Sequence, residues 1–256
     1  GGVARMTLRL ERDGAIARLL FDRADKRNAM TQEMWAALPA LVEEAMADDS
    51  IAVLILTSAT PGLFCAGADI GEFATHSANE DWRIANQSAI RASHAALAHA
   101  SKPVIAAIDG DCIGGGCGLA MACDIRVAAP TARLGITPAK LGIVYSLFDT
   151  KLLVGLVGPG QAKRLLYTAA LIDAAEALSI GLIEEIAEDP MARATAMAQT
   201  IAANAQHSVR STKNIIRRIV DGQTDDDPET LMMFRDAFTR AEFTARVEAF
   251  RTRRSS

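Results

Sequence analysis

The chain has 256 residues, half of them hydrophobic and 23% charged, with a formal net charge of -4. This length and composition fit one large globular domain, or one domain with an appendage. The basic residues form no broad stripe, so nucleic acid is not expected as a partner, and no apolar stretch approaches the ~20 residues of a membrane span. The N-terminus lacks the apolar run of a signal peptide, and a cytoplasmic location is expected.

Four cysteines stand at Cys65, Cys112, Cys117 and Cys123. They form no C-x-x-C pair and have no histidine nearby in the sequence, so no metal site is predicted. Buried free thiols in a reducing compartment are the expected state.

The first quarter of the chain alternates strand and helix signals. Residues 7–23 predict a hairpin that turns at Asp13-Gly14. Residues 31–49 have helical spacing, with Thr31 as N-cap and a kink expected at Pro39. A continuous apolar run over 51–58 then predicts a buried strand, followed by a glycine-rich loop.

The same alternation continues to about residue 137. Residues 79–100 predict a helix, 104–110 a second buried strand, 114–124 a loop leading into a helix, and 125–130 a third strand. This order predicts an α/β fold with a parallel or mixed sheet. Beyond about Leu147 the strand signals fade, and the rest reads as helices, three of them long stretches from Pro190 onward.

Two small-residue loops follow two of the predicted buried strands, "CAGADI" at 65–70 and "IGGGCGLA" at 113–120. In an open α/β sheet, ligands bind where such loops lead into helices, because free N–H groups and the positive end of the helix dipole meet there. Two facing helix N-termini could hold one negatively charged oxygen in an oxyanion hole. A phosphate-binding loop or simple tight packing are the alternatives. A P-loop is disfavoured because no Gly-Lys-Ser/Thr follows the glycines.

Four blocks of sequence carry a resemblance to a known family: "RADKRNAM", "FCAGADI", "KPVIAAIDGDCIGGGCGLAMACDIRVAA" and "AAEALSIGLIEE". In this order they resemble the enoyl-CoA hydratase/isomerase (crotonase) superfamily. The resemblance implies a ClpP-like spiral α/β core of ββα units over residues 1–190, and an all-helical trimerisation region over 191–256. It also implies an acyl-CoA thioester substrate whose carbonyl becomes an enolate, and a homotrimer or a hexamer built from two trimers.

The resemblance assigns site residues position by position. The oxyanion-hole donors would be the backbone N–H groups of Ala68 and Gly115. Coenzyme A enters as part of the substrate, with no prosthetic group. The residues implied to bind it are Lys26, Arg27, Ala29, Ala66, Ala68, Asp69, Ile70, Gly71 and, from the C-terminal segment, Phe250.

The sequence departs from the pattern of the family's hydratases at two positions. Those enzymes carry two glutamates, which the resemblance aligns with Gly118 and Pro138. Neither residue can transfer a proton in the way that paired carboxylates do. Efficient hydration, and isomerisation by a glutamate at position 138, are therefore not expected.

An oxyanion hole without a general base suits decarboxylation of a malonyl-type CoA ester, because loss of CO₂ forms the enolate directly. The segment "TPAKLGIVYSL" resembles methylmalonyl-CoA decarboxylases, which have a tyrosine at the position of Tyr145. Tyr145 could orient the carboxylate or deliver a proton; a packed aromatic side chain is the alternative. Those decarboxylases have a histidine where this chain has Ala68, which argues against the assignment.

Two further hypotheses remain open: a hydratase or isomerase with a relocated acid/base, and a non-catalytic CoA-binding protein. Glu72, Asp111 and Asp149 are the carboxylates that could replace a missing base. His76 and His94 are interpreted as surface or helix-face histidines. Asp69 and Asp124 are expected to cap or support loops.

Overall fold

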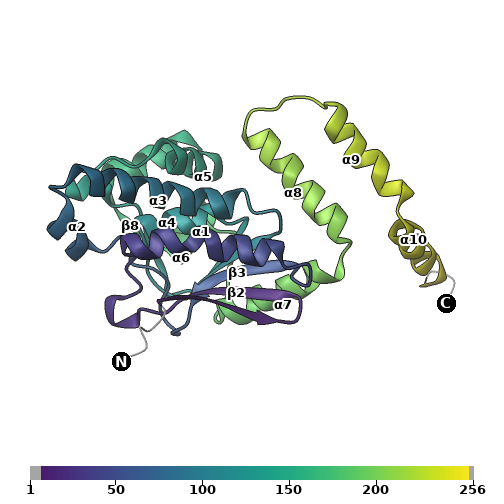
Figure 1. Cartoon of the computed structure of the whole chain (residues 1–256), viewed down its shortest axis with the longest axis horizontal. Coiled ribbons are helices and arrows are strands. Elements are labelled where there is room, and N and C mark those ends of the chain that lie inside the picture. Colours follow the sequence, from purple (N-terminus) through teal and green to yellow (C-terminus); the bar gives the residue numbers. More distant parts are fainter. Residues whose placement is uncertain (1–6, 254–256) are drawn as a thin grey trace.

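A computed structural model gives the structure of residues 7–253. Within these residues, two β-sheets form the centre of the fold, one with strand order β1-β2-β3-β4-β6-β9 and one with order β5-β7-β8 (Figure 1). The strands are β1 (Leu8–Asp13), β2 (Ile16–Phe21), β3 (Val53–Ser58), β4 (Val104–Ile108), β5 (Cys112–Ile113), β6 (Ile125–Ala128), β7 (Arg133–Gly135), β8 (Leu171–Asp173) and β9 (Glu185–Ile186).

Helices cover both faces of the larger sheet and continue beyond it. They are α1 (Gln32–Ala47), α2 (Ile70–His76), α3 (Glu80–Ala98), α4 (Gly115–Ala122), α5 (Leu147–Thr168), α6 (Ala174–Ser179), α7 (Pro190–Ala203), α8 (Gln206–Val220), α9 (Pro228–Thr239) and α10 (Ala241–Arg253), with the 3-10 helices η1 (Ala24–Lys26) and η2 (Pro138–Leu141). The α/β fold expected from the alternation of strands and helices is confirmed.

The central strands are buried on both faces, which explains their continuous apolar sequences. In β3, Leu54 and Leu56 belong to the large core that also contains residues of α1. Val53 and Ile55 belong to a second core on the other face, with Ala194 of α7. The hairpin of β1 and β2 is antiparallel, whereas β2, β3 and β4 run parallel, so the segments that follow these three strands leave the same edge of the sheet.

Helix α1 begins at the predicted N-cap, where Thr31 Oγ1 accepts a hydrogen bond from Met34 N. The helix continues through Pro39, where the sequence predicted a kink. Proline lacks the N–H that would bond to the carbonyl four residues earlier, which belongs to Trp35. Ser93 Oγ of α3 donates to Trp35 O at 2.6 Å in the buried interior, so this carbonyl is satisfied from a neighbouring helix.

The prediction that strands end near residue 147 was wrong. β8 pairs antiparallel with β7, and β9 pairs parallel with β6. These strands have only three and two residues, which is too short for a periodic pattern, and their pairing partners define them. α5 contains a non-helical residue, Gly158 (φ 74°), directly before Pro159, so it comprises two helices that meet there.

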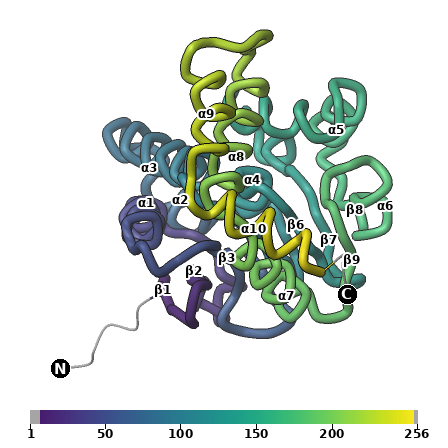
Figure 2. Tube along the Cα trace, turned by 90° about the vertical axis from the view of Figure 1, so that its right-hand side faces the viewer, coloured from purple at the N-terminus to yellow at the C-terminus, as the bar shows by residue number. Residues whose placement is uncertain are grey.

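Helix α7 packs on the sheet, and α8, α9 and α10 extend away from the core (Figures 1 and 2). The projecting region thus begins after Ala203 and not at 191, because Ala194 and Ala198 of α7 fill the second core. The C-terminal region contains four helices where three long ones were expected, since α9 and α10 are separated at Arg240.

The four cysteines are free and buried. Burial raises the pKa of the Cys65 and Cys123 thiols to about 12, so they stay protonated. Over residues 7–253, none of the helices is long and apolar enough to cross a bilayer.

The contact between Ser93 and Trp35 leads to a stability prediction. Ser93→Ala removes the donor and leaves the Trp35 carbonyl buried without that partner, which lowers the free energy of unfolding by about 1–2 kcal/mol. Chemical denaturation followed by circular dichroism measures the change. Ser88→Ala, at an exposed site on the same helix, is the matched control for helix propensity. Equal stabilities of the two variants would contradict the assigned role of Ser93.

Candidate functional site

Three backbone segments converge at the edge of the sheet where β2, β3 and β4 end. Met30 and Ala68 form an isolated parallel bridge, and Cys65 and Cys112 form another. Gly67, between these bridges, has φ 92°, and a Cβ atom there would lie 2.7 Å from the carbonyl oxygen of Ile113. Only glycine allows this approach, which brings the loop before α2 against the loop before α4.

Ala68 and Gly115, whose N–H groups are the predicted donors, lie near this contact. A Cβ atom built on Gly115 would lie 3.9 Å from the nitrogen of Ala68. The bridge to Met30 uses Gly67 O at 2.7 Å and Asp69 N at 2.9 Å, and so does not use the Ala68 N–H. Gly115 is the first residue of α4, where N–H groups have no acceptor within the helix. Two donors at the ends of facing loops can bind one negatively charged oxygen.

The glycine after the donor allows the second close approach. A Cβ atom on Gly116 would lie 2.5 Å from the carbonyl oxygen of Cys65, so α4 can only reach this loop without a side chain there. Backbone contact between the two loops thus explains Gly116, whereas Gly114 has φ 54° and a Cβ atom on Gly115 would lie 2.9 Å from the Trp35 ring.

Tyr145 lies beside the start of α4. Its hydroxyl donates to the carbonyl oxygen of Gly114 at 3.0 Å. This carbonyl and the Gly115 N–H belong to the same peptide unit, so the hydrogen bond polarises the group that would donate to the bound oxygen. Burial, and then the neighbouring Cys117, raise the pKa of Tyr145 well above its usual value, which keeps the hydroxyl protonated.

His94 lies on the buried face of helix α3, so it is not a surface histidine. Its side chain is 1% exposed, and its ring contacts that of Trp35 edge-on with centroids 5.5 Å apart. His94 Nδ1 lies 2.6 Å from Asp149 Oδ1. The sequence signal was weak, because helix α3 carries few hydrophobic residues that would show which side faces the core. His76, in contrast, is exposed and stacks on Trp82 as a surface side chain.

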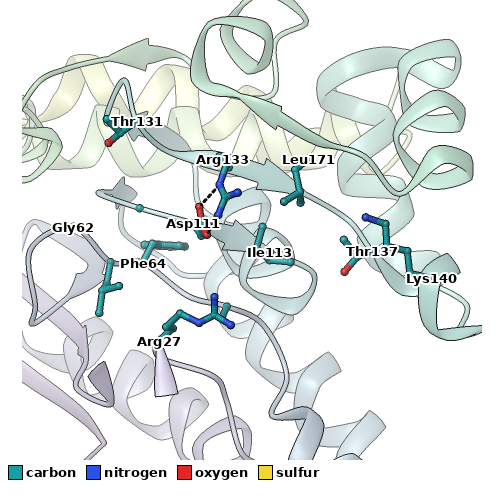
Figure 3. Close-up of a pocket in the computed structure, with 13 residues that line it drawn as sticks. Arg27, Gly62, Phe64, Asp111, Ile113, Thr131, Arg133, Thr137, Lys140 and Leu171 are labelled. Carbon is teal, nitrogen blue, oxygen red and sulfur yellow. Dashed lines mark hydrogen bonds and ion pairs between the residues drawn. The ribbon is translucent and has the colours of Figure 1, made fainter. Parts of the chain in front are cut away.

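A cavity of about 540 Å³ opens beside the two loops (Figure 3). Ala66 and Ile113, each two residues before one of the N–H donors, line it. Arg27, Arg133 and Lys140 bring positive charge, although Arg133 forms an ion pair with Asp111 in which the closer of its two contacts is 2.6 Å. Such a cavity can accept a ligand with anionic groups.

Two of the residues expected to bind CoA have structural roles. Asp69 caps α2 through Glu72 N, as expected, and pairs with Arg23 at 2.7 Å. The hydrogen bond from Arg23 lowers the pKa of Asp69 and holds it as a carboxylate. Arg23 also donates to the carbonyl oxygen of Ala29, so the backbone of Ala29 is held by the same arginine that holds Asp69.

The remaining predicted binding residues lie in three places. Lys26, Ile70 and Gly71 are exposed, Lys26 in η1 next to Arg27 and the other two at the start of α2. Phe250 is on α10, which lies on the opposite side of the molecule from α2 in Figure 1. The site therefore does not include Phe250 of the same chain.

The other carboxylates considered as replacement bases already have partners. Glu72 Oε2 accepts a hydrogen bond from Gln32 N at 2.8 Å, and Asp111 holds Arg133. Asp124 accepts from Val104 N at 2.7 Å and thus supports a loop, as expected. Pro138 begins η2, and Gly118 lies within α4, one turn after Gly115.

Comparison with known proteins agrees with this geometry. The family model described as enoyl-CoA hydratase/isomerase matches residues 11–256. The chain is 37% identical over 213 residues to a short-chain-enoyl-CoA hydratase of Clostridium acetobutylicum, covering 82% of this chain and 80% of that protein. It is 35% identical over 233 residues to a crotonyl-CoA hydratase of Syntrophomonas wolfei, covering 90% and 87%.

Solved structures share the fold. A crystal structure of an enoyl-CoA hydratase/isomerase family protein from Hyphomonas neptunium superposes with a TM-score of 0.93 at 41% identity, covering 97% of this chain and 95% of that one. The matching family model, the sequence relatives and the shared fold show that the chain belongs to the enoyl-CoA hydratase/isomerase family.

Proposed function

We propose that this protein forms the enolate of an acyl-CoA thioester in an oxyanion hole made by the N–H groups of Ala68 and Gly115. The observation that supports the proposal is the contact between the two loops, where a Cβ atom built on Gly115 would lie 3.9 Å from Ala68 N. Both donors are backbone N–H groups in fixed positions, so they need not reorient as charge develops on the thioester oxygen. The Tyr145 hydroxyl on Gly114 O supports the second donor.

The cavity next to the hole supports binding of the CoA moiety. Arg27 and Lys140 line it, and basic side chains suit the phosphates of coenzyme A. Ala66 and Ile113, which line the cavity, are each two residues before one of the proposed donors. A thioester held there would have its carbonyl next to the two N–H groups.

The chemistry that follows enolate formation differs from that of a paired-glutamate hydratase. Positions 118 and 138 carry glycine and proline, so neither can activate water or protonate carbon. The proposal is therefore an enolate reaction that needs at most one proton-transfer group, such as movement of a double bond.

Decarboxylation of a malonyl-type ester is a second candidate. In that step the C–C bond to the carboxylate breaks, CO₂ leaves, and the electron pair forms the enolate. The observation that favours it is the neutral Tyr145 hydroxyl beside Gly118, which carries no charge to repel a carboxylate.

We also propose that the projecting C-terminal helices assemble the chain into a trimer or hexamer. Phe234, Phe238 and Phe243 form a continuous aromatic row across α9 and α10, and Phe234 remains 67% exposed. Large apolar patches of this kind mark protein–protein contacts.

A substrate panel tests the type of reaction. Purified protein is assayed with crotonyl-CoA, a 3-enoyl-CoA and methylmalonyl-CoA, with products identified by mass spectrometry. We expect turnover of the 3-enoyl or the malonyl-type ester to exceed hydration of crotonyl-CoA, because two carboxylates are missing. Robust hydration of crotonyl-CoA would falsify this part of the proposal.

A pair of substitutions at Gly115 tests the oxyanion hole. Gly115→Pro removes the N–H donor but also adds a Cβ atom 2.9 Å from the Trp35 ring. Gly115→Ala adds the same Cβ atom and keeps the donor, so it is the matched control. We expect kcat of the proline variant to fall about 10²–10³-fold below that of the alanine variant. Equal rates of the two variants would refute the role of this N–H.

The oligomeric state is measured by light scattering during size exclusion. We expect a molar mass three or six times that of one chain, and a lower mass for the double variant Phe234→Ser/Phe238→Ser, because it makes the aromatic row polar. A wild-type protein that elutes as a single chain would contradict the proposed assembly.

A further inference from the structure

The space next to Gly118 is occupied by two polar side chains from other elements. A Cβ atom on Gly118 would lie 2.5 Å from His94 Cε1, 3.0 Å from His94 Nε2 and 3.0 Å from the Tyr145 hydroxyl oxygen. Any side chain at position 118 would displace the imidazole. His94 and a residue larger than glycine at 118 are therefore mutually exclusive in this packing.

The imidazole of His94 is held in one orientation. Its Nδ1 lies 2.6 Å from Asp149 Oδ1, and the two side chains are 1% and 5% exposed. Ser146 Oγ donates to Asp149 Oδ2 at 2.7 Å, which fixes the carboxylate in turn. Asp149 is in the first turn of α5, so its backbone is fixed by the helix. This carboxylate holds the proton on Nδ1 and leaves the lone pair on Nε2.

The other ring nitrogen has no hydrogen-bond partner. His94 Nε2 is buried and unpaired within the described residues, although buried polar atoms in folded proteins nearly always have a partner. It lies beside Gly118, one helical turn after the donor Gly115. An oriented, unpaired base next to an oxyanion hole is arranged to act on a ligand that occupies the hole.

We propose that His94 is the proton-transfer group of this enzyme, positioned by Asp149 in the space that a side chain at residue 118 would otherwise fill. The proposal rests on the proposed function, because it needs a thioester in the oxyanion hole.

The step is a proton abstraction followed by reprotonation. The Nε2 lone pair takes a proton from the Cα atom of the thioester, and the C–H electron pair becomes the C=C bond of the enolate. The carbonyl π pair moves to oxygen, where the N–H groups of Ala68 and Gly115 stabilise the charge. Asp149 stabilises the resulting imidazolium, whose Nε2 proton exchanges with solvent before the imidazolium protonates a carbon atom of the enolate.

Hydrogen exchange in D₂O tests this step apart from any complete reaction. Acetyl-CoA, butyryl-CoA and octanoyl-CoA have no double bond to hydrate or move, so uptake of deuterium at Cα reports proton transfer alone. His94→Gln keeps a side chain of similar size that cannot act as a base. We expect its exchange rate to fall about 10²–10⁴-fold, with unchanged affinity for the thioester measured by calorimetry.

Two further variants separate chemistry from structure. Asp149→Asn also lowers the exchange rate, because an amide can donate to Nδ1 and place the ring proton on Nε2. Addition of imidazole to His94→Ala restores part of the exchange, which a purely structural role would not allow. His99→Gln, the same substitution at an exposed position next to α3, keeps the wild-type rate.

The possible failures are distinguishable. Exchange by His94→Gln at the rate of His99→Gln overturns the role of His94 and leaves the oxyanion hole intact. Wild-type protein that binds these thioesters without exchanging Cα hydrogen also overturns it. Wild-type protein that binds none of the three esters overturns the proposed function itself.

Discussion

The contact between the two loops that follow β3 and β4 is the constraint on which the site depends. The two backbones lie in direct contact. A Cβ atom on Gly67 would lie 2.7 Å from Ile113 O, and a Cβ atom on Gly116 would lie 2.5 Å from Cys65 O. Side chains are excluded at these points, so the loops that carry Ala68 and Gly115 can lie against each other. The parallel arrangement of β2, β3 and β4 makes this possible, because all three strands end at one edge.

The region behind this contact is packed by aromatic and polar groups that connect the hole to its surroundings. The Trp35 ring lies where a Cβ atom of residue 115 would be, and it also contacts the His94 ring edge-on. The carbonyl of the same Trp35, which Pro39 leaves without a helical donor, accepts the Ser93 hydroxyl one residue before His94. The hydrogen bond that Pro39 removes from α1 is thus replaced by one from α3, the helix that carries His94.

Much of the architecture was predictable from local patterns. The apolar runs predicted β3 and β4, Thr31 predicted the start of α1, and the two small-residue loops are the segments that contact each other. The short strands β8 and β9 were missed, because two or three residues carry no periodicity and are defined only by their partners. The contact of His94 was missed for a related reason: its partner Asp149 is 55 residues away in the sequence.

The sequence by itself determined the order of strands and helices, the glycines that allow close backbone contact, and the absence of a carboxylate at positions 118 and 138. These properties are local, since they follow from side-chain size, hydrophobic periodicity and residue identity. Only the tertiary structure decided what occupies the space beside Gly118. Glycine at that position leaves a volume, and the packing of α3 and α5 against α4 fills it with His94 held by Asp149. Close packing of elements distant in sequence therefore turned a missing side chain into a site with its own oriented base.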